Sequence, residues 1–152
     1  MPAVPSSTFH LVGNIITVLT PPLGSKGQMM VALCRTKPGA GSPHNRHPRD
    51  DESFYVLTGE FEFLVDGQTT RCGPGGFVAV PNGSPHQFTN TATTDSTMLI
   101  ICAPGRVHDS FFREAGDALA DANGAWPDRP PDFPALEAAA RRCGIEFLAD
   151  LH

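Results

Sequence analysis

The sequence predicts an all-β fold, a closed antiparallel sandwich or barrel, with a short helical tail at its C-terminal end. From about residue 9 to residue 104, short β-like runs alternate with turn signals. The 15 Gly and 15 Pro residues are many for a helical protein and are typical of a turn-rich β fold. After Pro104-Gly105 the apolar residues change to helical spacing. We expect residues 1–104 to form the barrel and 105–152 a helical extension of the same domain, since 152 residues suffice for one well-buried core.

Eight strands are expected in the barrel. Each is a short run of β-forming residues that ends at Gly, Pro, Asp or Asn. Asp66-Gly67 is the strongest hairpin signal, because it follows a run in which acidic and phenylalanine residues alternate. The regular spacing of the runs favours a closed antiparallel architecture. The expected strands are 14–19, 28–35, 53–57, 60–65, 69–72, 77–80, 86–90 and 97–102.

Two helices are expected after the barrel. Residues 107–123 carry apolar side chains at helical spacing and stop at Gly124. Residues 135–143 form the second predicted helix, with Gly144 as the residue that ends it in a left-handed conformation. We expect both helices to pack on the outside of the barrel, because three apolar residues need cover: Phe111, Leu119 and Leu136.

Composition limits the classes of partner. The net charge is −5 and no run of like charges occurs, so neither a nucleic-acid nor a membrane surface is indicated, and a small molecule is the expected partner. The N-terminus lacks a basic region and a small-residue cleavage site, and the apolar patch 11–19 is too short to span a bilayer. We therefore expect a soluble, cytoplasmic protein. The four Cys are far apart and form no C-x-x-C pair, which favours reduced thiols over disulfides or a zinc ribbon.

The most informative segment is 75–90. It contains Gly75, Pro81, Gly83, His86 and Asn90 at fixed offsets. Pro81 and Gly83 bracket a tight turn, in which Gly supplies a positive φ. The turn leads into a strand on which His86 and every second residue after it share one face.

A second set of polar residues lies upstream. Pro48 bends the chain after His47, and Glu52 begins the next strand. Imidazole and carboxylate groups together suit one divalent transition metal ion, Fe, Mn, Ni, Co, Cu or Zn. A buried Glu52 without a cation or donor would be costly, so a metal accounts for it. The competing interpretation is an exposed acidic loop with a surface histidine.

These residues carry a resemblance to a known family. The segment 75–90 matches in full the second motif of single-domain cupins, the RmlC-like jelly-roll barrels. Gly39, His47, Glu52 and Gly59 match the first motif of that family. The tail, with Phe111-Phe112-Arg113-Glu114 and Gly144-Ile145-Glu146, also resembles the quercetinase-like bacterial subgroup. The resemblance implies an antiparallel jelly-roll barrel with a metal site.

The first motif departs from the family pattern at one ligand position. Where the family has its first histidine, two residues before His47, this chain has Asn45, and His44 comes one residue earlier. In a regular strand Asn45 and His47 share a face and His44 points away. A bulge at His44 would restore a third imidazole; otherwise Asn45 offers its amide oxygen, or water fills the position. A site that has lost its metal is the remaining alternative.

The resemblance also implies roles. His44, His47, Glu52 and His86 are the expected metal ligands, with Asn45 replacing His44 if no bulge forms, and Glu52 is also the expected catalytic base. The implied function is a quercetinase-like dioxygenase acting on a small aromatic or enolisable compound. The alternatives are a non-oxidative isomerase, cyclase or lyase and a non-catalytic binding protein. Phenylalanines could line the substrate pocket or simply pack in the core: Phe54, Phe63, Phe77 and Phe88.

Cupins often pair through strand exchange or sheet packing. The resemblance therefore implies a homodimer, with the N-terminal strand 14–19 as a candidate interface.

Overall fold

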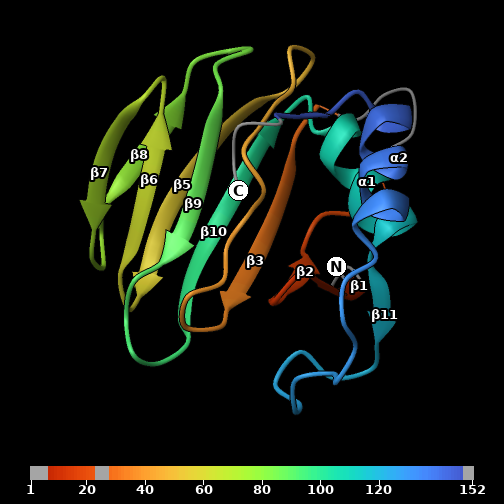
Figure 1. Cartoon of the computed structure of the whole chain (residues 1–152), viewed down its shortest axis with the longest axis horizontal. Helices are drawn as coiled ribbons and strands as arrows, with labels where there is room; N and C mark the ends of the chain where they lie inside the picture. The colour runs from red at the N-terminus through yellow and green to blue at the C-terminus, as the bar shows by residue number, and fades with distance from the viewer. Residues whose placement is uncertain (1–6, 23–27, 149–152) are drawn as a thin grey trace, which may run out of the picture.

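Two antiparallel sheets form the walls of a jelly-roll barrel (Figure 1). The structure is a computed structural model, and it describes residues 7–22 and 28–148. The larger sheet contains, in spatial order, β11 (Asp117–Leu119), β1 (Ser7–Leu11), β2 (Asn14–Val18), β3 (Met30–Thr36), β10 (Ser96–Ala103), β5 (Asp51–Thr58) and β8 (Phe77–Val80). The smaller sheet contains β12 (Glu146–Phe147), β4 (Asn45–Arg46), β9 (His86–Asn90), β6 (Phe61–Val65) and β7 (Gln68–Cys72). The predicted all-β, antiparallel fold class is confirmed.

Side chains alternate between the barrel interior and its outer surface, as a pleated strand requires. On β5 the buried residues are Glu52, Phe54 and Val56, and on β9 they are His86, Phe88 and Asn90. Phe54 packs against Phe63 and Phe88 across the two sheets, with ring centroids 5.1 and 5.7 Å apart. The same alternation that builds this aromatic core places Glu52 and His86 inside the barrel.

The turn between β8 and β9 has the predicted glycine geometry. Gly83 has φ of +76°, which a residue with a side chain rarely adopts. The amide of Ser84 donates to the carbonyl oxygen of Pro81 at 3.0 Å, closing the turn. β9 starts three residues after Gly83, so this turn fixes which face of the strand His86 occupies.

The first helix is shorter than the sequence predicts. α1 covers Arg106–Ala115, and the chain then extends into β11, which pairs with β1. The backbone of Gly116 is extended and ends the helix. A Cβ there would lie 2.6 Å from that of Phe9, so glycine allows the chain to run closely over β1. Leu119 is therefore a half-buried strand residue and not part of a helix.

The second helix is close to the prediction. α2 covers Phe133–Cys143, with the side chain of Asp132 accepting a hydrogen bond from the amide of Ala135. Gly144 ends α2 with φ of +95°, as expected for a left-handed terminal residue.

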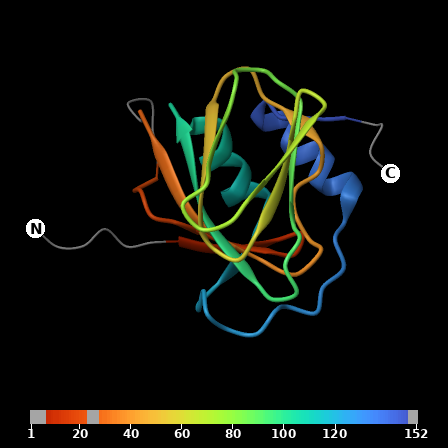
Figure 2. The ribbon, with the colours of Figure 1, turned by 90° about the vertical axis from the view of Figure 1, so that its left-hand side faces the viewer.

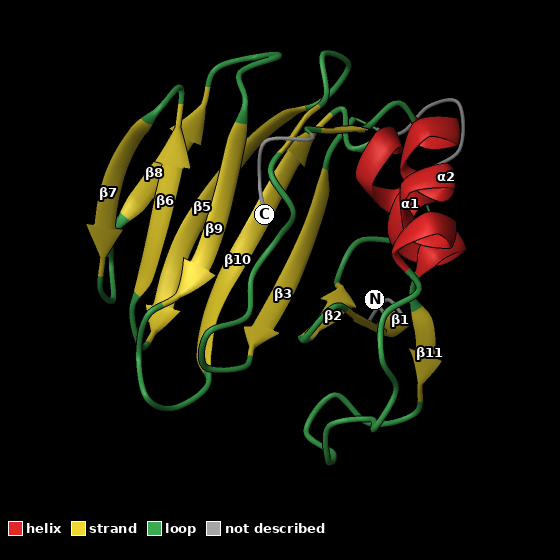
Figure 3. Ribbon diagram, viewed as in Figure 1, coloured by secondary structure: helices red, strands yellow, loops and turns green. Residues whose placement is uncertain are grey.

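The helices close one side of the space between the sheets. Figure 2 shows them behind the barrel, and Figure 3 shows both confined to that side. α1 contacts β1 and β3, and α2 contacts α1 and β12. Phe111 and Leu136 are buried in the same core as the barrel strands and line a cavity inside the barrel, so the helices expected on its outside also contribute side chains to its interior.

In the described ranges, neither helix has the length and apolar character needed to cross a membrane.

Candidate metal centre

Three side chains from two strands and one turn meet inside the barrel. Glu52 comes from β5, His86 from β9, and His47 from the turn that follows β4. Oε1 of Glu52 lies 3.0 Å from Nε2 of His47 and 2.9 Å from Nε2 of His86. The two imidazole Nε2 atoms are 3.1 Å apart. These residues are at most 6% exposed, so the structure brings together three of the sequence-predicted ligands in a buried cluster.

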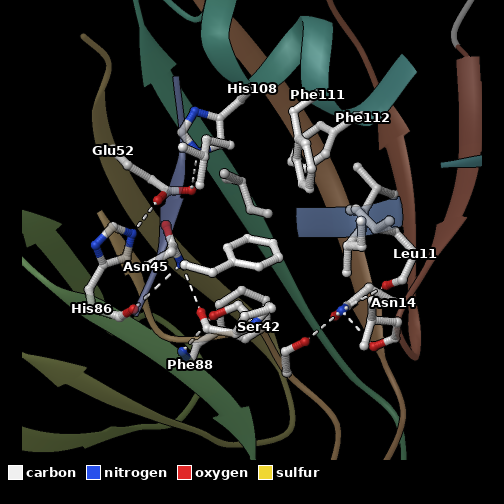
Figure 4. A pocket seen from close by; sticks show the side chains of 18 of the residues that line it. Leu11, Asn14, Ser42, Asn45, Glu52, His86, Phe88, His108, Phe111 and Phe112 are labelled. Carbon is white, nitrogen blue, oxygen red and sulfur yellow. Dashed lines mark hydrogen bonds and ion pairs between the residues drawn. The ribbon is translucent and has the colours of Figure 1, made fainter. Parts of the chain in front are cut away.

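A third imidazole enters the cluster from helix α1. Nε2 of His108 lies 3.4 Å from Oε2 of Glu52, and its ring stands perpendicular to that of His47 at a centroid distance of 4.3 Å. His47, Glu52 and His108 place one candidate ligand atom each within 4.8 Å of the others. Figure 4 shows Glu52 between His86 and His108.

Sequence reasoning missed His108, although the signal was present. Helical spacing places residue 108 on the same face as Phe111, which was expected to need cover, and as Phe112. A histidine on a buried helix face needs polar partners, and here the partners are Glu52 and Asp50.

The structure places His44 and Asn45 on opposite sides of the chain. Asn45 is in β4, pairs with His86, and lines the same cavity as the cluster. His44 precedes β4 and lines a different groove, with Gln87 and Phe133. Between the Gly41–Thr89 bridge and the Asn45–His86 pair the register against β9 shifts by one residue, but this irregularity leaves His44 directed away from the cluster. The structure therefore does not bring His44 to the cluster, and Nδ2 of Asn45 donates to the carbonyl oxygen of Pro43 at 2.8 Å.

The Nδ1 atom of each clustered imidazole is already hydrogen-bonded. Nδ1 of His47 lies 3.0 Å from the carbonyl oxygen of Asp50, and Nδ1 of His86 lies 2.8 Å from that of Ser84. Nδ1 of His108 lies 2.9 Å from Oδ2 of Asp50. Because carbonyl and carboxylate oxygens only accept, each Nδ1 carries a proton. A neutral ring then directs its Nε2 lone pair into the cluster, where a metal could bind it, whereas His47 or His86 with a second proton donates from Nε2 to Glu52.

The donor set fits a divalent transition metal. Nε2 lone pairs that face one another and a carboxylate at 2.9–3.4 Å repel unless a proton or a cation lies among them. Imidazole nitrogen and carboxylate oxygen are ligands that such ions accept, and hydrogen bonds from the opposite ring nitrogen are usual around metal-binding histidines.

The electrostatics of the cluster favour an ionised carboxylate. Burial opposes ionisation of Glu52, but the positive potential of His108 and hydrogen bonds from His47 and His86 outweigh it and hold the pKa well below its usual value. Burial likewise opposes protonation of His47, but its hydrogen bond to Glu52 outweighs this and raises the pKa of the imidazole.

The cluster forms the charged end of a cavity whose remaining lining is mostly apolar. Phe54 and Phe88 line it, as predicted for a substrate pocket, and Phe111 and Phe112 of α1 form part of the opposite wall (Figure 4). Phe63 does not line the cavity but packs in the aromatic core. Phe77 is 59% exposed on β8, because its side chain points to the outer face of the sheet. The structure thus places two of the four predicted pocket residues at the cavity.

Comparison with known proteins identifies the barrel. The family model described as "Cupin domain" matches residues 32–102. This chain is 30% identical to quercetin 2,3-dioxygenase of Bacillus subtilis (strain 168) over 91 residues, which are 60% of the chain. Over 60 residues, 39% of this chain, it is 44% identical to the dimethylsulfoniopropionate lyase DddQ of Ruegeria pomeroyi. These alignments span 26% and 28% of the two relatives, about a quarter of their length.

The fold is also found in solved structures. The RmlC-like cupin of Shewanella frigidimarina superposes with a TM-score of 0.56 over 66% of this chain and 86% of that chain, at 22% sequence identity. The family match over residues 32–102 and the superposition agree, and this chain contains a cupin domain with the jelly-roll fold.

Proposed function

We propose that this chain is a metal-dependent oxygenase of quercetinase-like type, which acts on a small aromatic or enolisable compound. The observation that carries the proposal is the convergence of three imidazole Nε2 atoms and one carboxylate at the polar end of an apolar cavity. The similarity to quercetin 2,3-dioxygenase supports the reaction class.

Four residues would hold the metal. His47, Glu52 and His86 are the ligands that the sequence suggests, and His108 replaces the imidazole that is absent at Asn45. When bound, the ion would supply Lewis acidity to an oxygen atom of the substrate. The hydrogen bonds at Nδ1 of each ring hold the imidazoles in the orientation that ligation requires.

Glu52 has a second proposed role as general base. The carboxylate is ionised at neutral pH, the form that could accept a proton from an enol or phenol hydroxyl. The side chain is at the cavity wall, within reach of a substrate that occupies the cavity.

The cavity lining favours a mostly apolar substrate. Among the described residues that line it, none is Lys or Arg, and the only charged or titratable groups are Glu52, His86 and His108. A phosphate or dicarboxylate would find no cation there apart from the metal centre. A flat molecule with one oxygen-bearing edge matches the arrangement, because its apolar part would contact Phe54, Phe88 and Phe112.

Oxygen consumption tests the proposal. Protein loaded with Fe, Mn, Ni or Co would be given a panel of flavonols and β-diketones, and O₂ uptake would be recorded together with substrate loss. We expect uptake in step with substrate loss, and both should be abolished in Glu52→Gln. Substrate loss without O₂ uptake would contradict oxygenase activity.

The second candidate is a non-oxidative lyase or isomerase. The 44% identity to the DddQ lyase favours it, although the aligned segment is short. Turnover under strict exclusion of O₂ would support this reaction class. Tight binding of the same compounds without turnover under any metal would instead support a binding protein.

We also propose a homodimer formed through the outer face of the larger sheet. Leu33, Leu99, Tyr55 and Phe77 are register neighbours across β3, β10, β5 and β8, and their side chains form an outward apolar row. β2, by contrast, is paired on both sides and fully buried, so the predicted strand 14–19 offers no free edge for strand exchange. Light scattering should give a molar mass twice that of one chain, and Tyr55→Lys should reduce it to the mass of a single chain.

The cytoplasmic location stays a prediction.

A further inference from the structure

Asp50 joins the barrel to helix α1. Its side chain is 1% exposed and lies in the turn between β4 and β5. Oδ1 accepts a hydrogen bond from the amide of Gly105 at 2.9 Å. Oδ2 accepts from the amide of His108 at 3.1 Å and from its ring Nδ1 at 2.9 Å. One buried carboxylate therefore contacts both the start of the helix and the ring that the helix delivers to the cluster.

We propose that Asp50 is a positioning residue that makes His108 a metal ligand and thereby couples metal binding to the docking of helix α1. This inference rests on the proposed metal centre, because it concerns one of that centre's ligands. It assigns helix α1 a part in building the site as well as covering the barrel.

The first step of the argument concerns the tautomer of His108. An ionised Asp50 has only acceptors, and Oδ2 lies 2.9 Å from Nδ1, so Nδ1 must donate. The proton is then absent from Nε2 in the neutral ring, and this lone pair faces Oε2 of Glu52 at 3.4 Å. An asparagine at position 50 would have one acceptor oxygen for three N–H groups. Its amide nitrogen would favour the other tautomer, whose protonated Nε2 cannot bind a metal.

The second step concerns the start of the helix. Gly105 precedes α1 with φ of +91°, and a Cβ there would lie 2.5 Å from that of Met30. This residue can supply no side-chain cap, so Asp50, 55 residues earlier in the chain, accepts from the buried amides of Gly105 and His108 instead. A carboxylate at a helix N-terminus is favourable for both hydrogen bonding and the helix dipole.

Together the two contacts link metal binding to the docking of α1 against the barrel. If His108 binds the metal, the bound ion must hold α1 against the barrel, and displacement of α1 must weaken metal binding by the same factor. A purely structural Asp50 would behave differently. Its loss would lower stability but leave the metal affinity and the set of ligands unchanged.

The test uses Co(II) as the probe, with the full-length metal-free chain. Metal affinity would be measured by chelator competition, the ligand set by the visible absorption of bound Co(II), and α1 docking by hydrogen exchange of residues 106–115 with and without the ion. The variants are Asp50→Asn, His108→Ala and, as control, Asp132→Ala. Asp132 caps the N-terminus of α2 in the same way, with Oδ1 3.1 Å from the amide of Ala135.

We expect Asp50→Asn to lower Co(II) affinity about 10- to 100-fold, as loss of a residue that orients a ligand does. Its Co(II) spectrum should match that of His108→Ala, and both variants should lose the metal-dependent protection of α1. Asp132→Ala should keep the affinity and the spectrum of the unaltered protein. His108→Ala leaves the cap of α1 intact, so it tests the coupling even if Asp50→Asn fails to fold.

The outcomes separate the two proposals. Co(II) binding by the unaltered protein, with affinity, spectrum and protection unchanged in His108→Ala or in folded Asp50→Asn, would overturn this inference alone. Failure of the unaltered protein to bind Co(II) would overturn the proposed metal centre and this inference with it.

Discussion

Nε2 of His47 and Nε2 of His86 lie 3.1 Å apart, although Nδ1 of each ring is already hydrogen-bonded to a backbone carbonyl oxygen. Two neutral imidazoles in this arrangement direct lone pairs at each other and at the carboxylate of Glu52. The arrangement is stable only with a positive charge among them, supplied by a proton or by a metal ion. The predictions below separate the roles of the residues around this point.

Asn90 should be a structural residue although it belongs to the motif that contains His86. Its Nδ2 donates to the carbonyl oxygens of Thr36 and Thr94, and its Oδ1 accepts from the amide of Ala92 and the hydroxyl of Ser96. Asn90→Ala would leave buried groups without partners and should lower the free energy of unfolding by about 1–3 kcal/mol, as measured by urea denaturation. Metal content should be unchanged, and a folded variant that cannot bind metal would contradict this assignment.

The pH dependence of the metal-free protein should show a maximum on the acidic side of neutrality. The lowered pKa of Glu52 stabilises the fold above the ordinary value of 4.5, and this stabilisation is lost as the pH falls through the folded value. The raised pKa of His47 stabilises the fold below 6.5, and this is lost as the pH rises through the folded value. Both contributions are present between pH 4.5 and 6.5.

Thermal unfolding of metal-free and metal-loaded protein, followed from below pH 4.5 to above pH 6.5, would test this pH dependence. The loaded protein should gain stability above pH 6.5, because protons then compete less with the metal for the imidazoles. Stability of the metal-free protein that rises steadily through neutrality would contradict the pKa directions.

The four thiols should differ in reactivity. All are free; burial raises the pKa of Cys34 to about 12, and burial with the Glu114 hydrogen bond raises that of Cys143 to about 11. Burial raises the pKa of Cys102 as well. Since the thiolate is the reactive form, iodoacetamide should label the half-buried Cys72 first in the native protein and all four thiols in denaturant. Labelling of Cys34 as fast as Cys72, detected by peptide mass spectrometry, would contradict the burial of Cys34.

Phe88 and Phe77 should have opposite effects on ligand binding. Phe88 lines the cavity, whereas Phe77 is exposed on the outer face of the larger sheet. Phe88→Ala should weaken binding of a flavonol about tenfold or more, since it removes apolar contact worth about 1.5–3 kcal/mol. Phe77→Ala should leave the dissociation constant unchanged in the same fluorescence titration. Equal effects of the two substitutions would contradict binding of the flavonol in the cavity that Phe88 lines.

Much of the barrel could be predicted because its signals are local. All eight expected strands are present within a few residues, since alternation and turn residues are readable in short windows. The four other strands, β1, β4, β11 and β12, are short or defined by partners far along the chain. β11, for example, exists because residues after Gly116 pair with β1, and helical spacing in the sequence hid this.

The candidate site could be predicted only in part for a related reason. His47, Glu52 and His86 follow from spacing within two motifs, whereas His108 reaches the cluster through the docking of a helix. The choice between His44 and Asn45 depended on whether β4 contains a bulge, which a sequence does not show. Likewise, Phe63 and Phe77 are both on strands with alternating burial, but only the positions of the sheets determine which phenylalanines reach the cavity.

Metal content of matched histidine variants tests the central claim most directly. The protein would be purified without chelator, reconstituted with each divalent transition metal, and analysed for metal per chain. We predict one ion per chain in the unaltered protein and in His44→Ala, which removes an imidazole outside the cluster, and strong loss in His86→Ala. No stoichiometric metal in the reconstituted protein, or full metal content in His86→Ala, would contradict the account.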